Sequence, residues 1–208
     1  MLNIFYGMYN IWLAMSDITP DVLIPLLQAL GEQLDASGSP THLVVIGGSG
    51  LLAMGLGDRP TQDVDVVAFV EDGELVTATP FPEFLGEAAL RVANDFALKP
   101  EWLNAGPTSL LGLGLPTGFV GRLTTVDYGP ALRVSFASRF DQVQLKLYAF
   151  ADRQEARDEA DLRRLEPSGD ELHCGARWAR THNAPGPFDD HLAWVLRSFG
   201  VEDAGRDT

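Results

Sequence analysis

Apolar and polar positions recur along the chain in two spacings, which predict helices and strands in turn. Residues 20–35 repeat leucine or valine every three or four positions, and this spacing predicts an amphipathic helix. The β-branched runs at 42–46 and 63–70 are short and bounded by glycine or turn residues, as in buried strands. Between them we expect a short helix over 49–57 that ends at glycine, followed by a turn over 57–62.

The second half of the chain predicts further strands and then mainly helices. Residues 81–98 place apolar side chains on one helical face, whereas the Gly- and Pro-rich residues 104–118 predict a long loop. The pattern over 141–165 predicts either one long helix or two helices separated near Arg153. Two more strands and a last helix are expected at about 119–127, 131–137 and 189–199. These elements predict the α/β (α+β) class, with a small mixed sheet flanked by helices and a helical C-terminal part.

Length and composition are those of a folded protein with one substantial core. The 208 residues are 46% hydrophobic and 21% charged, which excludes disordered, collagen-like and coiled-coil chains. We expect a core over 16–140, a helical part over 141–199 and a frayed tail over 200–208. The apolar leader, residues 1–15, is too short to span a bilayer and lacks the basic flank of a signal peptide, so no membrane association is expected. Two interpretations of it stay open: a start codon misassigned upstream of Met15, or a packed N-terminal strand or helix.

Charge is distributed unevenly along the chain. The net charge is −14, and residues 1–98 hold 13 acidic side chains against two arginines. An anionic ligand is therefore expected to bind to side chains of the second half, residues 99–208, which contains most of the arginines. Generic binding to duplex nucleic acid is not expected, because that affinity depends on neutralising many phosphates. Cys174 is the only cysteine, so no internal disulfide can form, and we predict a cytoplasmic protein.

Two aspartates open the second predicted strand, just after a glycine turn. Asp63 and Asp65 are two residues apart, so on a strand both carboxylates point to one face. Two carboxylates crowded in an apolar strand repel each other, and Mg²⁺ or Mn²⁺ would relieve that repulsion while also binding substrate phosphates. A phosphate could approach the backbone closely at three glycines, Gly47, Gly48 and Gly50. The backbone amides at the start of the following helix could then bind its oxygens. The alternative for the aspartates is that they are two exposed acids at a strand end. The alternative for the glycines is that they form a tight turn packed against the sheet.

These residues carry a resemblance to a known superfamily. The order G-G-S, short helix, R-x-T-x-D-V-D comprises Gly47, Gly48, Ser49, Arg59, Thr61, Asp63 and Asp65. It resembles the first motif of the polymerase-beta-like nucleotidyltransferases, and within them the small bacterial enzymes related to abortive-infection and type IV toxin–antitoxin toxins. A second block, which comprises Lys146, Arg153, Asp158 and Asp161, resembles the later lysine, arginine and aspartate motif of that family. The resemblance covers about residues 42–166.

The resemblance implies a nucleotidyltransferase fold and Mg²⁺-dependent transfer of a nucleotidyl group. The donor would be a nucleoside triphosphate and the acceptor an RNA, a protein or a small molecule, and the protein could be a toxin-like component with an antitoxin partner. Asp63 and Asp65 would bind the metal and, with Lys146, form the catalytic set. The nucleotide would be bound by Gly48, Ser49, Arg59, Thr61, Lys146 and Arg153.

The second block can be judged by helix geometry. Lys146 and Arg153 are seven residues apart and return to the same helix face, which suits a triphosphate. Asp158 can join them only if the helix breaks between them. The alternative is a solvated helix with ion pairs along its surface.

The third metal carboxylate of the superfamily is not evident in this chain. Asp127 is the one obvious candidate, and the next predicted strand offers Ser135 instead. Without a third acid, two-metal catalysis would be weak or absent. The first alternative function is therefore a catalytically silent protein of this fold that binds nucleotide or a partner.

A dinucleotide-binding oxidoreductase is the other alternative. Gly48, Gly50 and Ala53 fit the pattern G-x-G-x-x-A after a strand, with Glu71 about twenty residues later. Against it, the helix after the glycines is too short to cross a parallel sheet.

Overall fold

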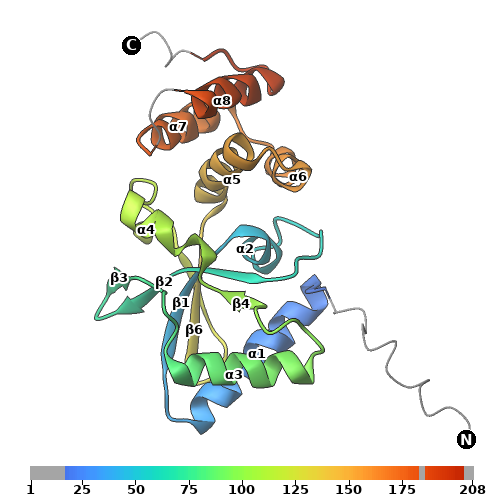
Figure 1. Cartoon of the computed structure of the whole chain (residues 1–208), viewed down its shortest axis with the longest axis vertical. Coiled ribbons are helices and arrows are strands. Elements are labelled where there is room, and N and C mark those ends of the chain that lie inside the picture. The colour runs from blue at the N-terminus through green and yellow to red at the C-terminus, as the bar shows by residue number, and fades with distance from the viewer. Residues whose placement is uncertain (1–16, 183–185, 204–208) are drawn as a thin grey trace, which may run out of the picture.

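The protein, described from a computed structural model, forms a mixed sheet flanked by helices (Figure 1). The structure describes residues 17–182 and 186–203, so the predicted leader and the end of the predicted tail lie outside the described residues. The strand order is β3-β2-β1-β6-β5, and β4 also pairs with β2. The strands are β1 (Thr41–Ile46), β2 (Val64–Glu71), β3 (Glu74–Val76), β4 (Leu103–Asn104), β5 (Thr124–Asp127) and β6 (Leu132–Phe136).

Helices precede, separate and follow these strands. They are α1 (Pro20–Ala36), α2 (Gly47–Ala53), α3 (Glu83–Asp95), α4 (Ser109–Leu113), α5 (Arg139–Arg153), α6 (Ala156–Arg164), α7 (Gly169–Arg180) and α8 (Pro187–Ser198), with 3-10 turns at Gly106–Thr108 and Val120–Arg122. Strand β1 runs antiparallel to β2 and parallel to β6, so the sheet is mixed. The predicted α/β class, with a helical C-terminal part, is confirmed.

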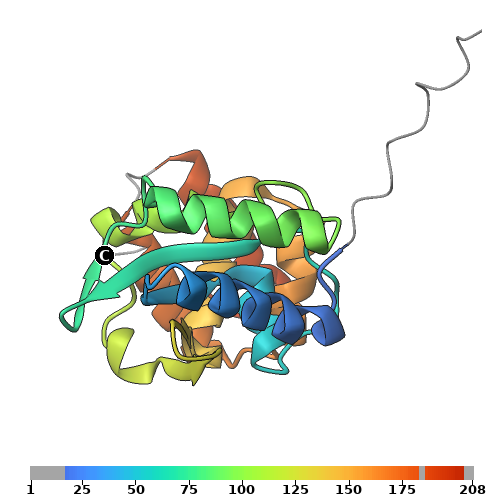
Figure 2. The same cartoon turned by 90° about the horizontal axis from the view of Figure 1, so that it is seen from below.

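The central strands β1 and β2 are buried on both faces of the sheet, whereas β5 is exposed. Helices α1 and α3 lie side by side across one face (Figure 2), where they bury Leu43 and Val45 of β1. On the other face, Val44 and Ile46 pack with α4, the chain just after it and Leu145 of α5. Successive side chains of a strand point to opposite faces, so covering both faces requires the continuous apolar run seen in β1.

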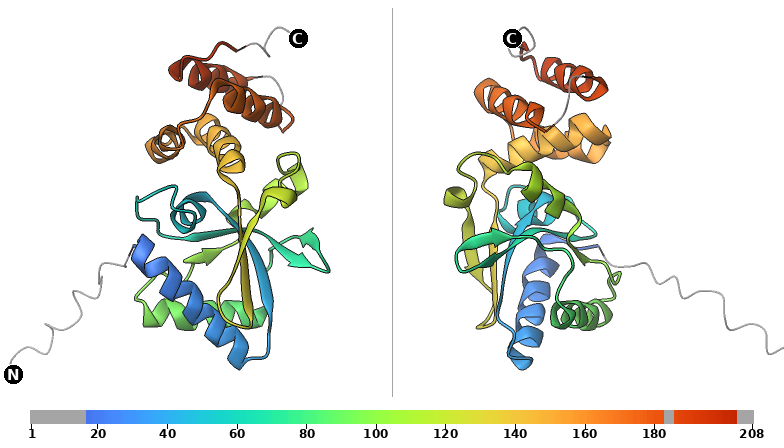
Figure 3. Two further views of the ribbon diagram at one scale, coloured as in Figure 1. Left: turned by 180° about the vertical axis from the view of Figure 1, so that it is seen from behind. Right: turned by 60° about the vertical axis from the view of Figure 1, so that its left-hand side comes forward.

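Helices α5 to α8 stack beyond one end of the sheet (Figure 3). They bury an apolar cluster of their own, which includes Val143, Leu147, Leu162, Leu172 and Leu192. Helix α5 packs against α6, α7 and α8 and also touches α2, the helix that begins at the glycine turn. The division of the chain near residue 140 into a core and a helical part stays a prediction.

The structure settles the open prediction over residues 141–165 in favour of two helices. Helix α5 ends at Arg153, Gln154 adopts a left-handed conformation at φ 57°, and α6 begins at Ala156. A left-handed residue ends a helix because its carbonyl and amide no longer follow the helical path. This break turns α6 back toward α5.

Several elements differ from the sequence-based prediction. The predicted loop over 104–118 contains α4. The strand predicted over 119–127 begins only at Thr124, after the 3-10 turn at Val120–Arg122. The β2–β3 hairpin was not predicted from the sequence. It turns through Asp72 and Gly73, which both have positive φ, and this pair of residues is typical of tight hairpins. Helix α7 was missed too, although Ser168 begins it with a capping box.

The dinucleotide-binding alternative is wrong. That fold needs parallel strands on either side of the glycine turn, and β1 and β2 are antiparallel. Glu71, the acid that would bind a ribose, lies at the far end of β2, beside the hairpin to β3.

Candidate functional site

The glycine turn and the second aspartate fit against each other. Asp65 pairs with Ile46 across β1 and β2, so its side chain lies beside the turn that follows Ile46. Gly47 has φ 75°, and a Cβ at this position would lie 2.7 Å from Asp65 Oδ2. Glycine is therefore required here both by the backbone conformation and by the approach of the carboxylate.

Asp63 and Asp65 face one cavity, as their spacing predicted. We call it the aspartate cavity; it has a volume of about 430 Å³. Its wall comprises Asp17, Gly48, Arg59, Pro60, Thr61, Gln62, Asp63, Asp65, Lys146, Arg153, Arg157 and Asp158. Burial raises the pKa of Asp65, and the charge of Asp63 raises it further. The two carboxylates therefore repel each other, and a cation between them would relieve that repulsion.

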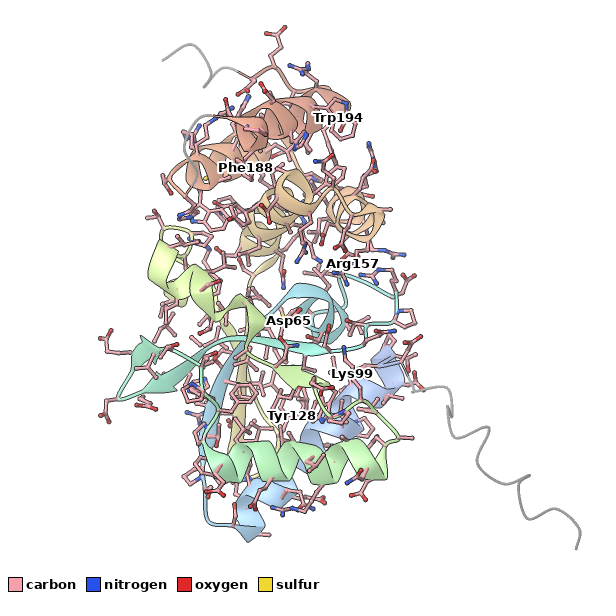
Figure 4. The ribbon with its side chains drawn as sticks, viewed as in Figure 1. Asp65, Lys99, Tyr128, Arg157, Phe188 and Trp194 are labelled. Atoms are coloured by element: carbon pink, nitrogen blue, oxygen red, sulfur yellow. The ribbon has the colours of Figure 1, made fainter. Side chains whose placement is uncertain are left out.

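Each aspartate also has its own hydrogen-bonding partners. Thr61 Oγ1 lies 3.3 Å from Asp63 Oδ1, and Lys99 Nζ lies 3.3 Å from Asp63 Oδ2. The Asn104 side chain hydrogen-bonds to Asp65, and this bond acts to lower the pKa of Asp65. Figure 4 shows Asp65 between the sheet and the C-terminal helices, with Lys99 and Arg157 on opposite sides of it in that view.

The second block forms a chain of alternating charges across the cavity from the aspartates. Lys146 Nζ lies 2.7 Å from Asp161 and 3.3 Å from Asp158, and all three side chains are nearly inaccessible to water. Arg153 contacts Asp158 at 2.7 Å, and Arg59 contacts Asp161 at 3.1 Å. The break after α5 makes this possible, because it brings Asp158 back beside Arg153. The solvated-helix alternative is therefore wrong for Lys146, Asp158 and Asp161, whereas Arg153 is 45% exposed.

This network keeps Asp161 ionised. Burial alone would raise the pKa of Asp161, but Lys146 and Arg59 outweigh burial and hold it below its ordinary value. With three cations and two carboxylates, the network carries a net positive charge, and Lys146 and Arg153 line the aspartate cavity. The surplus charge comes from Arg59, because the two cations and two acids from the second half of the chain balance each other.

Ser49 is not brought to the aspartate cavity. Gly48 lines it, whereas Ser49 is fully buried, and its hydroxyl has no hydrogen-bonding partner. The same is true of the amide of Gln142, whose nitrogen lies 2.7 Å from where a Cβ of Gly50 would be. Buried polar groups of this kind are commonly satisfied by an internal water, and Gln142 also lines a neighbouring cavity.

A second cavity opens on the other side of Asp65. Its volume is about 400 Å³, and it shares Asp65, Lys146 and Arg153 with the aspartate cavity. The rest of its wall is more apolar and includes Ile46, Leu110, Leu145 and Tyr148. A ligand with a charged part and a flat apolar part could therefore extend across Asp65 from one cavity into the other.

Asp127 does not belong to the site, and its prediction as the third carboxylate is wrong. It pairs with Arg133 at 2.8 Å, and Arg133 is in register with His42 at the start of β1, whereas Asp65 pairs with the last residue of β1. Ser135 is also engaged elsewhere, in hydrogen bonds with His42 and Thr125. The neighbour of Asp65 on the outer side of β2 is Asn104, on β4.

Three residues of the site were missed by the sequence analysis. Lys99 precedes the short strand β4 and Asn104 ends it, and this strand carries too few residues to be recognised by its pattern. Arg157 follows the helix break and lines the aspartate cavity, where it pairs with Glu155. The one available signal was composition, since Lys99 and Lys146 are the only lysines in the chain.

The described residues contain neither a ready-made group of metal-binding side chains nor a membrane-spanning helix. Across residues 17–182 and 186–203, no three His, Cys, Asp or Glu side chains are grouped so that they could hold a metal ion. Over the same part of the chain, no helix has the length and apolar character needed to cross a membrane.

Comparisons with known proteins give one similar structure. No protein-family model matches the chain, and neither does any curated protein. The chain is similar to a solved structure described as an antigenic nucleotidyltransferase-like protein from Paracoccidioides brasiliensis. The TM-score is 0.48 and the sequence identity 19%, over 88% of this chain and 91% of that chain.

Proposed function

We propose that this protein binds a nucleoside triphosphate with a divalent cation and transfers its nucleotidyl group to an acceptor. The observation that carries the proposal is the aspartate cavity, where Asp63 and Asp65 face Lys146 and Arg153 from the second half of the chain. Two carboxylates opposite a positive wall suit a ligand that is itself a cation joined to a polyanion.

The residues present fit Mg²⁺ or Mn²⁺. Asp63 and Asp65 supply carboxylate oxygens, which these hard cations prefer, and their mutual repulsion favours a cation between them. Mg²⁺ is commonly held by one or two carboxylates together with substrate phosphates, so two protein ligands suffice for binding. When bound, the cation would neutralise phosphate charge and polarise the phosphorus under attack.

The chain's own residues would divide the remaining work. Gly48 and Thr61 line the wall beside the aspartates and would contact phosphate oxygens. Arg153 and Arg157 would face the pyrophosphate, where charge increases as it leaves. In the transfer, an acceptor oxygen or nitrogen forms a bond to the α-phosphorus, the bond from that phosphorus to the bridging oxygen of pyrophosphate breaks, and the acceptor proton passes to solvent.

The first test is calorimetric titration with each of the four ribonucleoside triphosphates, with and without Mg²⁺. We expect binding that requires Mg²⁺ and that weakens by at least about tenfold in Asp65→Asn. Asp127→Asn is the matched control, because it neutralises an aspartate far from the cavity and should bind as the wild type does. Equal binding by both variants would contradict the proposal.

The thermal stability of Asp65→Asn separates a functional carboxylate from a structural one. Burial and Asp63 both disfavour the charged form of Asp65, so removing its charge should raise the melting temperature while binding is lost. A structural carboxylate would instead lower the melting temperature when neutralised.

A catalytically silent nucleotide-binding protein is the second candidate. It is favoured by Asn104, an amide in the sheet position beside Asp65, and by the lack of a three-acid group among the described residues. Incubation with α-labelled triphosphates and cell extract decides between the two. Label transferred to RNA, protein or a small molecule by the wild type, but not by Asp63→Asn, supports transfer; Mg²⁺-dependent binding without transfer supports the silent protein.

The role as a toxin-like component with an antitoxin partner depends on the sequence resemblance alone. It stays a prediction, as do the identity of the acceptor and the cytoplasmic location.

A further inference from the structure

One short segment of the chain contacts both aspartates from the side opposite the helices. It runs from Lys99, after α3, to Asn104, at the end of β4. Lys99 Nζ lies 3.3 Å from Asp63 Oδ2, and Asn104 hydrogen-bonds to Asp65. The two contacts differ in kind, because the amide of Asn104 is neutral whereas Lys99 brings a full positive charge.

The cations on the helical side are already paired with other acids. Lys146 and Arg153 contact Asp158, and Lys146 also contacts Asp161. Over residues 17–182 and 186–203, Lys99 is the one cationic side chain in ion-pair contact with either Asp63 or Asp65. It is therefore the nearest counter-charge of the aspartate pair in the protein alone.

An ammonium group and a divalent cation would compete for the same carboxylate oxygen. Both bind carboxylate lone pairs, and each repels the other at contact distance. The Lys99–Asp63 pair is about one-third exposed, with side-chain exposures of 27% and 30%, so the ammonium can leave into water without a large desolvation change.

We propose that Lys99 is the counter-ion of the aspartate pair in the cation-free protein and that it weakens cation binding by occupying Asp63 Oδ2. This inference rests on the proposed function, which places the cation at Asp63 and Asp65. A consequence is that the cation alone binds weakly, and that it binds well only when phosphates of the nucleotide supply further oxygen ligands.

The test is a titration with Mn²⁺ in the absence of nucleotide, followed by the electron paramagnetic resonance signal of free Mn²⁺. Lys99→Met should bind Mn²⁺ about five to ten times more tightly than the wild type. Lys99→Arg, which keeps the charge, should stay within about twofold of the wild type. Arg91→Met is the control for net charge, because Arg91 pairs with Glu87 on the surface of α3, and it should also stay within about twofold.

The outcomes are distinguishable. Unchanged or weaker Mn²⁺ binding by Lys99→Met, with binding by the wild type intact, overturns the role of Lys99 and leaves the proposed function standing. Adding Asp65→Asn to Lys99→Met should abolish Mn²⁺ binding; if it does not, the cation lies elsewhere and both inferences fail. A melting temperature for Lys99→Met within roughly 2–4 °C of the wild type is expected from a partly exposed pair and shows that the variant is folded.

Discussion

The two lysines of this chain should differ sharply in what they contribute to stability. Lys146 is 9% exposed and contacts two carboxylates that are themselves buried, Asp158 and Asp161. Lys99 is 27% exposed and contacts one carboxylate, which is 30% exposed. Replacing each by methionine keeps the length and the apolar stem of the side chain and removes the charge, so the two variants form a matched pair.

The magnitude follows from what each substitution leaves behind. Removing one partner of a buried ion pair destabilises a protein by about 3–5 kcal/mol, because the other charge stays buried without compensation. In Lys146→Met, Asp158 would keep Arg153 and Asp161 would keep Arg59, so we expect the lower end, about 3 kcal/mol. A partly exposed pair such as that of Lys99 is worth about 0–1 kcal/mol.

Urea unfolding at pH 7 followed by circular dichroism measures both free energies. A loss of about 3 kcal/mol also lowers the melting temperature by roughly 6–12 °C in a protein of this size. The reasoning is refuted if Lys146→Met stays within about 1 kcal/mol of the wild type, or if Lys99→Met is as destabilised as Lys146→Met. A large loss would also mean that Lys146 variants test the fold as much as nucleotide binding.

Three further predictions test the packing, the cation site and the buried acids. In Gly31→Ala, the new Cβ would lie 1.9 Å from the backbone oxygen of Tyr128, so thermal melting should show a loss of about 2 kcal/mol or more in the free energy of unfolding. Gly86→Ala, where the new Cβ meets nothing within 4 Å, should instead gain about 0.5–1 kcal/mol. Equal effects of the two substitutions would contradict the packing. Asn104→Asp should tighten Mn²⁺ binding by about tenfold in the titration above, because it adds a carboxylate beside the aspartate pair; weaker binding would contradict this. Asp161→Asn should lower the free energy of unfolding at pH 7. Its difference from the wild type should shrink as the pH falls below about 4, where the unfolded chain begins to bind the proton, and should be lost once the pH passes below the depressed pKa of Asp161 in the folded protein. A pH-independent difference in urea titrations would exclude this.

The local pattern of apolar and polar residues was enough to predict most of the helices and strands, and the spacing of Asp63 and Asp65 was enough to predict the aspartate side of the site. The leucine spacing of α1, the apolar run of β1 and the two-residue spacing of Asp63 and Asp65 depend on neighbours in sequence, and the structure has all three. Short elements such as β4 carry too few residues to show a period, so they were missed, and Lys99 and Asn104 were missed with them.

Only the tertiary structure decided which charges meet. The sequence placed Lys146 and Arg153 on one helix face, but their pairing with Asp158 and Asp161 required the helix to break at Gln154. Likewise, the sequence offered Asp127 as the third carboxylate, and only the sheet order placed β4, with Asn104, beside β2 and β5 at the opposite edge. Hydrophobic periodicity specifies which face of an element is buried, whereas the choice of partner across the sheet depends on register and topology, which are settled by packing of the whole chain.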